Sequence, residues 1–269
     1  VVLLHHGNYL HTPFWNYRRP RRVPLYTTMT QVLTAQDVAE KSAGEIGEII
    51  RAAMTYDEYR WQAENQIHIT EPFRAEGLHK ILYQCPSCLT ESRMESRGSE
   101  LSCAACGKRW EMDTLGRLRA LSGETEFSHI PDWFEWEREQ VRRQLEEGSY
   151  RFEDEVEVYS LPNAWRFQKL GRARLIHDMD QGFVVEGSYR GQPYRIHRPP
   201  LGMYGLHVEY DYCYVRPDDC VDISTDNDSL YCYPVRQNVV TKLSFATEEL
   251  YKMKRAAAAQ RRAASSAGG

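Results

Sequence analysis

The first 65 residues change from a strand-like to a helical pattern of apolar positions. Residues 1–4 are all apolar, which is typical of a central strand covered on both faces, and residues 23–33 are rich in β-branched side chains. From Thr34 onward, apolar side chains such as Ile46 and Ile50 recur at helical spacing. We therefore predict two strands followed by short helices, as at the end of an α/β domain. This pattern suggests that the chain is the C-terminal part of something longer.

Three pairs of residues with the [ST]-x-x-[DE] pattern mark the expected starts of these helices. In this pattern, the hydroxyl and the carboxylate each bond to backbone N–H groups of the first turn. The pairs are Thr34 with Asp37, Ser42 with Glu45, and Thr55 with Glu58. They predict helices near residues 35–41, 43–54 and 56–65.

From Tyr150 onward, apolar and polar positions mostly alternate, and turn residues recur at intervals typical of short strands. Eleven of the 17 tyrosines lie in this part of the chain, which suits a pleated surface. Many short strands indicate a sandwich or a barrel. One helix is predicted at 130–148, and another follows Asn238. Seven or so strands closed by one helix resemble a pleckstrin-homology-like barrel at the level of fold.

The fold class that follows is α+β with several domains. The predicted segments are the end of an α/β domain (1–65), a zinc ribbon (66–125), a connecting helix (126–149), a β-rich domain with a C-terminal helix (150–254) and a disordered tail (255–269).

Composition and charge exclude some classes of protein. Hydrophobic residues make up 42% and charged residues 27% of the 269 residues, an ordinary globular balance. The net charge of −4 argues against a general nucleic-acid binder, which is usually basic. No apolar run approaches the roughly 20 residues of a membrane span. We therefore expect a cytoplasmic protein.

The strongest chemical feature is a pair of C-x-x-C motifs. Cys85 and Cys88 are separated by 14 residues from Cys103 and Cys106. Two such turns can present four thiolates to one ion, with a β-hairpin between them and Gly107 allowing a tight second turn. A redox dithiol would need only one pair. We therefore predict a structural Zn²⁺ site, because a closed shell of four thiolates leaves no position for water.

The remaining cysteines and the charge around the motifs refine this prediction. Cys213, Cys220 and Cys232 are expected to be buried in strands as small hydrophobic residues, in keeping with a reducing compartment. Between Gln66 and Thr125 there are eight acidic and eight basic side chains, a poor electrostatic match for nucleic acid.

A basic cluster near the N-terminus is a second candidate site. It consists of Arg18, Arg19, Arg21 and Arg22, with no acidic residue between Val1 and Gln36. Guanidinium groups match phosphate oxygens, so the cluster could bind a phosphate or an anionic lipid head group. The alternative is a solvated loop between two strands.

Five longer stretches resemble the C-terminal half of bacterial lysophospholipid (1-acylglycerol-3-phosphate) acyltransferase-like proteins. They are HHGNYLHTPFWN (5–16), TEPFRAEGLHKILYQCPSC (70–88), CGKRWEMD (106–113), ETEFSHIPDWFEWER (124–138) and QNVVTKLSFATEELYKM (237–253). The resemblance implies transfer of an acyl group from an acyl donor to a lysophospholipid such as lysophosphatidate, at the inner face of the cell membrane. It also implies an anionic membrane surface as a partner.

The resemblance assigns no catalytic residue to this chain. The family's catalytic motif is His-x4-Asp, and no histidine here has an aspartate five positions later; His207 and Asp211 are one residue too close. We therefore expect the parent protein to be an acyltransferase and this chain to be inactive alone. The alternative is a non-catalytic zinc-ribbon adaptor that binds protein or nucleic acid.

Overall fold

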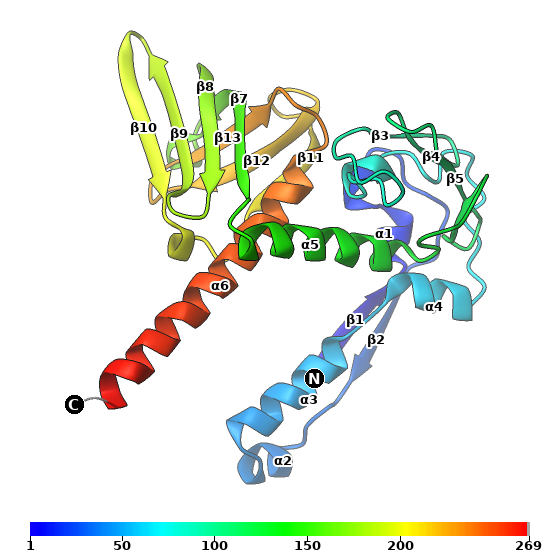
Figure 1. The fold of residues 1–269 in the computed structure, drawn as a ribbon. Helices are drawn as coiled ribbons and strands as arrows, with labels where there is room; N and C mark the ends of the chain where they lie inside the picture. The colour runs from blue at the N-terminus through cyan, green and yellow to red at the C-terminus, as the bar shows by residue number, and fades with distance from the viewer. Residues whose placement is uncertain (268–269) are drawn as a thin grey trace. The chain divides into compact units, whose positions relative to one another are not determined.

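The computed structural model describes residues 1–267 and divides them into two compact units. The first unit comprises residues 1–76, 96–101 and 109–130. The second comprises residues 77–95 and 102–108 together with everything from Pro131 onward. Figure 1 shows their helices and strands, labelled where there is room.

The first unit begins with a two-stranded antiparallel ribbon. β1 (Val2–His6) pairs with β2 (Tyr26–Thr30), with Leu4 opposite Thr28. Between them lie α1 (Asn8–His11) and the 3₁₀ turn η1 (Phe14–Asn16). The prediction of a buried central strand is wrong here. Within the described residues β1 pairs with β2 alone, and Leu3 is 52% exposed.

Three helices follow the ribbon, close to the predicted positions. They are α2 (Ala35–Glu40), α3 (Ala43–Met54) and α4 (Glu58–Glu64). Thr34 with Asp37 and Ser42 with Glu45 form complete capping boxes, as predicted. The third start is wrong, because the N-cap of α4 is Asp57, whose carboxylate accepts the Arg60 N–H. Aspartate is as good an N-cap residue as threonine, and the helix begins two residues after the start that the Thr55 pattern predicts.

One core cluster of the first unit lies next to the ribbon. Leu10, Val23 and Ile69 are buried together, and Tyr59 and Trp61 pack against them. His6 is also buried, with its ring nitrogens 2.9 Å from the Tyr56 and Thr28 hydroxyls. The pattern of contacts around His6 is that of a satisfied structural histidine.

Short strands near the cysteines form a four-stranded sheet. Its order is β3-β4-β5-β6, formed by β3 (Met94–Arg97), β4 (Glu100–Cys103), β5 (Arg109–Met112) and β6 (Leu118–Ala120). The predicted hairpin between the two cysteine pairs is therefore present as β3 and β4. Its turn contains Gly98 at a φ of +64°, a conformation that suits glycine.

The second unit contains the β-rich part of the chain. All seven of its long strands belong to one sheet, in the order β10-β9-β8-β7-β13-β12-β11. The strands are β7 (Arg151–Ser160), β8 (Gln168–Asp178), β9 (Gly182–Tyr189), β10 (Gln192–Arg198), β11 (His207–Tyr212), β12 (Asp218–Ser224) and β13 (Ser229–Pro234).

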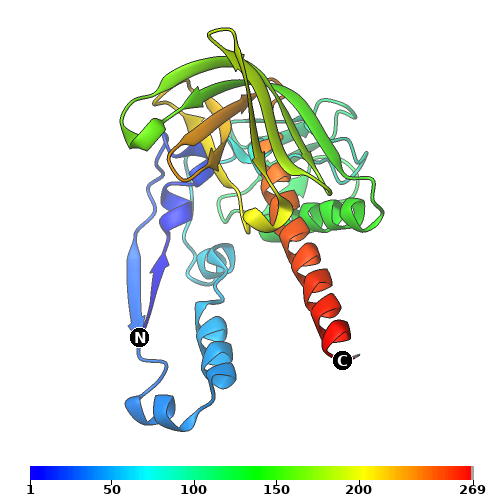
Figure 2. The same cartoon turned by 90° about the vertical axis from the view of Figure 1, so that its left-hand side faces the viewer.

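Two meanders make up this sheet. β7 to β10 follow one another, as do β11 to β13, and the meanders join where β7 pairs with β13, with Val158 opposite Cys232. The sheet is strongly curved in both views (Figures 1 and 2). Its inner side chains, including Val156, Leu175 and Ile223, are fully or almost fully buried. This part of the chain is β-rich, as predicted, but its strands form one sheet that ends at β10 and β11 and not the two stacked sheets of a sandwich.

Two helices complete the second unit. α5 (Ile130–Glu146) and α6 (Val240–Ala267) are joined by ion pairs between Arg138 and Glu248 and between Arg142 and Glu249. The first turns of α6 are buried, and its later turns extend away from the sheet (Figure 1). A disordered tail was predicted from residue 255, whereas α6 continues to Ala267; residues 268–269 lie outside the described part. None of the helices within residues 1–267 has the length and apolarity of a membrane span.

A buried histidine in this sheet makes the stability of the protein depend on pH. His177 is 1% exposed, its Nδ1 lies 2.9 Å from the Tyr150 hydroxyl, and its ring stacks on Phe183. Burial lowers its pKa to about 3. In an unfolded chain its pKa is about 6.5, so between these values the unfolded state binds more protons and stability falls as the pH falls.

We expect His177 to contribute a loss of about 1.4 kcal/mol per pH unit below pH 6.5. Urea unfolding at several pH values should show this slope reduced in His177→Gln. The control His197→Gln changes an exposed histidine on β10 and should keep the slope of the unchanged protein. Equal slopes in all three proteins would contradict the assignment.

Candidate metal centre

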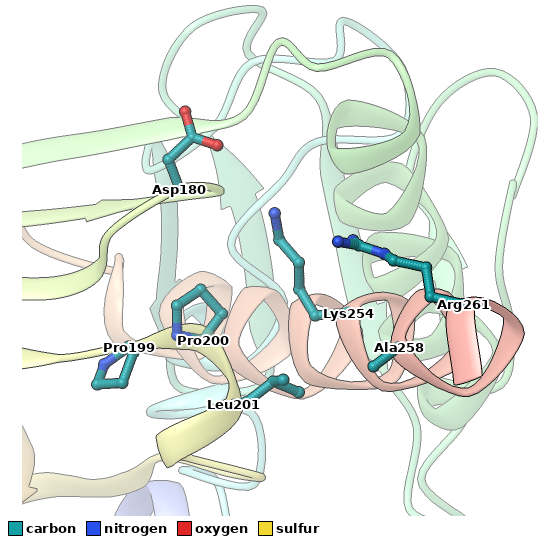
Figure 3. A pocket seen from close by; sticks show the side chains of 7 residues that line it. All are labelled: Asp180, Pro199, Pro200, Leu201, Lys254, Ala258 and Arg261. Carbon is teal, nitrogen blue, oxygen red and sulfur yellow. The ribbon is translucent and has the colours of Figure 1, made fainter. Parts of the chain in front are cut away.

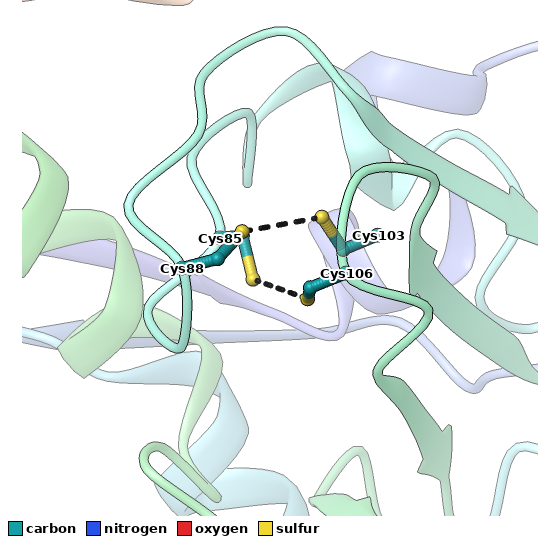
Figure 4. Close-up of side chains that lie close together, drawn as sticks. All are labelled: Cys85, Cys88, Cys103 and Cys106. Atoms are coloured by element: carbon teal, nitrogen blue, oxygen red, sulfur yellow. Dashed lines mark hydrogen bonds between the residues drawn. The ribbon is translucent and has the colours of Figure 1, made fainter.

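The two C-x-x-C motifs lie in the second unit, on two tight turns that face each other. Cys85 and Cys88 flank the first turn, while Cys103 ends β4 and Cys106 follows in the second turn. Figure 4 shows the four side chains converging from the two turns. Cys85 and Cys103 are buried, whereas Cys88 and Cys106 are exposed. The sequence predicted this grouping, and the four sulfurs are indeed brought together.

The distances between the sulfurs fit a tetrahedral metal shell. Cys85 Sγ lies 3.8 Å from Cys106 Sγ, and Cys88 Sγ lies 3.7 Å from Cys103 Sγ. All four ligand atoms lie within 4.8 Å of one another. A tetrahedron of sulfurs at about 2.3 Å from its centre has edges of about 3.8 Å. The cluster can therefore bind one metal ion.

The two turns repeat the same backbone hydrogen bonds. In the first turn, the Leu89 N–H donates to the Cys85 carbonyl (2.8 Å), and the Cys85 N–H donates to the Thr90 carbonyl (3.0 Å). The second turn repeats both bonds at the equivalent positions, from Gly107 N–H to the Cys103 carbonyl (2.8 Å) and from Cys103 N–H to the Lys108 carbonyl (2.9 Å). Matching turns of this kind orient paired thiols toward one point.

The fourth residue after each first cysteine adopts a left-handed conformation. Gly107 has a φ of +77°, as expected for a tight turn that needs glycine. Its counterpart Leu89 has a φ of +62° and is 59% exposed. A leucine rarely adopts this conformation, so the sequence offered no signal for the first turn beyond the cysteines themselves.

The pKa values of the two cysteines of the first turn are shifted in opposite directions by their surroundings. Burial raises the pKa of Cys85, although the backbone N–H groups of Cys88 and Ser87 partly oppose this. The Thr90 hydroxyl, 3.4 Å from Cys88 Sγ, contributes most to lowering the pKa of Cys88 to about 6. The exposed turn position thus favours a thiolate, the form that binds metal.

Helix α5 holds the residue that precedes the first turn. The Gln84 N–H donates to Glu137 Oε1 (2.7 Å), and Trp133 Nε1 donates to the Gln84 carbonyl (3.0 Å). Glu137 is fully buried, and burial raises its pKa well above its usual range. This role of Glu137 was not predicted from the sequence. Its only signal was an acidic residue at helical spacing among apolar positions of the predicted helix.

The basic cluster does not form one exposed patch. Arg21 is 2% exposed and donates to the carbonyls of Leu10 (3.3 Å) and Arg74 (2.6 Å), so it is a structural residue of the first unit. Arg19 forms an ion pair with Glu76 and lies over the Phe73 ring.

Only part of the cluster is therefore presented to solvent as predicted. Arg18, Arg19 and Arg22 are exposed, and the backbone N–H of Arg22 donates to Glu71 Oε1 (2.7 Å). The cluster has no acidic residue near it in sequence, but Glu71 and Glu76 approach it in the fold from 49 to 57 residues away. Local sequence could not reveal partners at that separation.

The remaining cysteines follow the prediction in two cases of three. Cys220 and Cys232 are fully buried in β12 and β13. Cys213 is exposed in the turn after β11, so its predicted burial is wrong.

Comparison of the chain with protein-family models, with curated proteins and with solved structures yields no match.

Proposed function

We propose that this chain binds one Zn²⁺ through Cys85, Cys88, Cys103 and Cys106, and that the ion is structural. The observation that carries the proposal is the set of sulfur–sulfur distances, which match the edges of a zinc–thiolate tetrahedron. Four protein ligands fill such a shell, so the ion would hold the two turns together and would not activate water. Iron also binds four thiolates, and the test therefore identifies the metal.

Elemental analysis of protein prepared without chelators tests this proposal. We expect about one zinc per chain and no stoichiometric iron. Four free thiols that appear only after zinc is removed would support the assignment. Protein that contains no metal and two disulfides within the cluster would contradict it.

A second candidate function rests on the sequence resemblance. We propose that the chain is the C-terminal part of a glycerophospholipid acyltransferase that acts on lysophosphatidate at the inner face of the cell membrane. Five stretches support this proposal, among them HHGNYLHTPFWN at 5–16 and TEPFRAEGLHKILYQCPSC at 70–88. In this account, the zinc-bound turns and the curved sheet are accessory parts. A non-catalytic adaptor is the competing function.

The purified chain should show no acyl transfer to lysophosphatidate. The reason is that it lacks a His-x4-Asp pair, and general acid–base catalysis is typically worth about 10²- to 10⁴-fold in rate. Activity should appear only with a partner segment that supplies this motif upstream. Turnover by the chain alone, abolished by His5→Ala or His6→Ala, would show that the active site lies here.

A further inference from the structure

A groove in the second unit lies between the loop after β10 and the later turns of α6. Its volume is about 380 Å³, within the range of sites for small ligands. The floor is apolar and consists of Pro199, Pro200, Leu201 and Ala258. Pro200 and Leu201 belong to the 3₁₀ turn η4 (Pro200–Gly202), and Leu201 is 51% exposed. This floor can cover the apolar part of a ligand.

Two cations line the α6 side of the groove. Lys254 and Arg261 are seven residues apart, which places them two turns apart on one face of the helix. Figure 3 shows both charged ends extending to the same side of α6. Neither side chain forms an ion pair or a hydrogen bond with any residue that the structure describes. Their charges are thus available to a ligand.

The charge of α6 supports the same conclusion. Residues 250–267 contain five lysines and arginines and no acidic residue. Cations near a helix C-terminus are favoured by the helix dipole, but that effect is confined to the last turn. Lys254 lies 13 residues before Ala267, which is about 20 Å along the helix axis. The dipole therefore does not explain Lys254.

We propose that this groove binds a phosphate monoester whose apolar stem lies on the floor formed by η4. A phosphate monoester carries about −1.5 to −2 charges at pH 7, which matches two cations better than a single carboxylate does. Arginine and lysine both bind phosphate oxygens, the former through its planar fork. The exposed carboxylate of Asp180 at the opposite rim directs the anion toward α6.

Three probes separate the possible sources of the phosphate group. Inorganic phosphate tests the head group alone, and hexyl phosphate tests a soluble ester with a stem. Phosphatidylcholine vesicles with and without phosphatidate test a head group at a bilayer. We expect hexyl phosphate to bind more tightly than inorganic phosphate, because the stem buries apolar surface.

Matched double variants test the residues. Lys254→Gln/Arg261→Gln should weaken hexyl phosphate binding about tenfold or more, because both charge-assisted hydrogen bonds to the phosphate are lost. Arg255→Gln/Arg262→Gln removes the same charge from the same helix, but neither residue lines the groove, and binding should be nearly unchanged. Leu201→Ser should weaken hexyl phosphate more than inorganic phosphate. Metal content and thermal unfolding verify that each variant is folded.

The outcomes decide the proposal. Retention on phosphatidate vesicles that depends on Lys254 and Arg261 identifies a lipid head group as the source. Binding of hexyl phosphate without vesicle retention identifies a soluble ester. Equal affinity in the two double variants, or no binding of any probe, overturns the proposal. None of these results depends on the identity of the metal at the cysteine cluster.

Discussion

Replacing Cys103 by serine should release the metal and cause the largest loss of stability of any single substitution in this chain. Binding to structural zinc sites contributes apparent free energies of about 10 to 16 kcal/mol in small zinc-finger peptides, and that energy is folding energy. Cys103 is buried, ends β4 and lies 3.7 Å from Cys88 Sγ. A serine hydroxyl cannot replace its thiolate in the shell.

The Cys103→Ser substitution should also loosen the structure around the metal site. Hydrogen exchange should accelerate within residues 80–120, and the zinc content should fall well below one per chain. Cys213→Ser is the matched control, because Cys213 is exposed and lies outside the cluster. It should change neither the metal content nor the exchange. If Cys103→Ser kept its zinc and its exchange pattern, the cluster would not be the metal site.

Replacing Lys80 by methionine should cause the second-largest loss. In the second unit, Lys80 Nζ lies 2.8 Å from Asp219 Oδ1 and 2.7 Å from Asp211 Oδ1. The Lys80 and Asp219 side chains are only 12% and 6% exposed. Removing the cation leaves a buried carboxylate without its partner, at a cost of about 3 to 5 kcal/mol. Burial already raises the pKa of Asp219, an effect that Lys80 opposes.

A second substitution separates this charge effect from loss of packing. In Lys80→Met/Asp219→Asn a neutral amide replaces the buried carboxylate, so most of the lost stability should return. Arg172→Met breaks an ion pair whose arginine is 80% exposed, and it should cost less than about 1 kcal/mol. Denaturant unfolding measures all three. A loss below about 1 kcal/mol in Lys80→Met would mean that the pair contributes little.

Much of the secondary structure could be predicted because its causes are local. The capping boxes at Thr34 and Ser42 act within one helical turn, and the alternating pattern after Tyr150 marks strands with one buried face. The metal site could also be predicted from the sequence. Two C-x-x-C turns with a hairpin between them present their thiols with little help from distant residues.

The features that were missed depend on long-range partners. Leu3 lies in an apolar run that is typical of a buried strand. In the described chain its strand pairs only with β2, and Leu3 is half exposed. Arg21 belongs to a basic stretch, yet it is buried because carbonyls of Leu10 and Arg74 accept its hydrogen bonds. Glu137 supports the first cysteine turn from a helix 53 residues away. Such roles depend on contacts between distant parts of the chain, and no local sequence pattern predicts them.

Zinc X-ray absorption spectroscopy on protein prepared without chelators tests the central claim most directly. It reports the type, number and distance of the atoms around the metal. We predict four sulfur ligands at about 2.3 Å and no nitrogen or oxygen ligand. A shell with fewer than four sulfurs, or a metal that is not zinc, would contradict a structural Zn²⁺ site formed by Cys85, Cys88, Cys103 and Cys106.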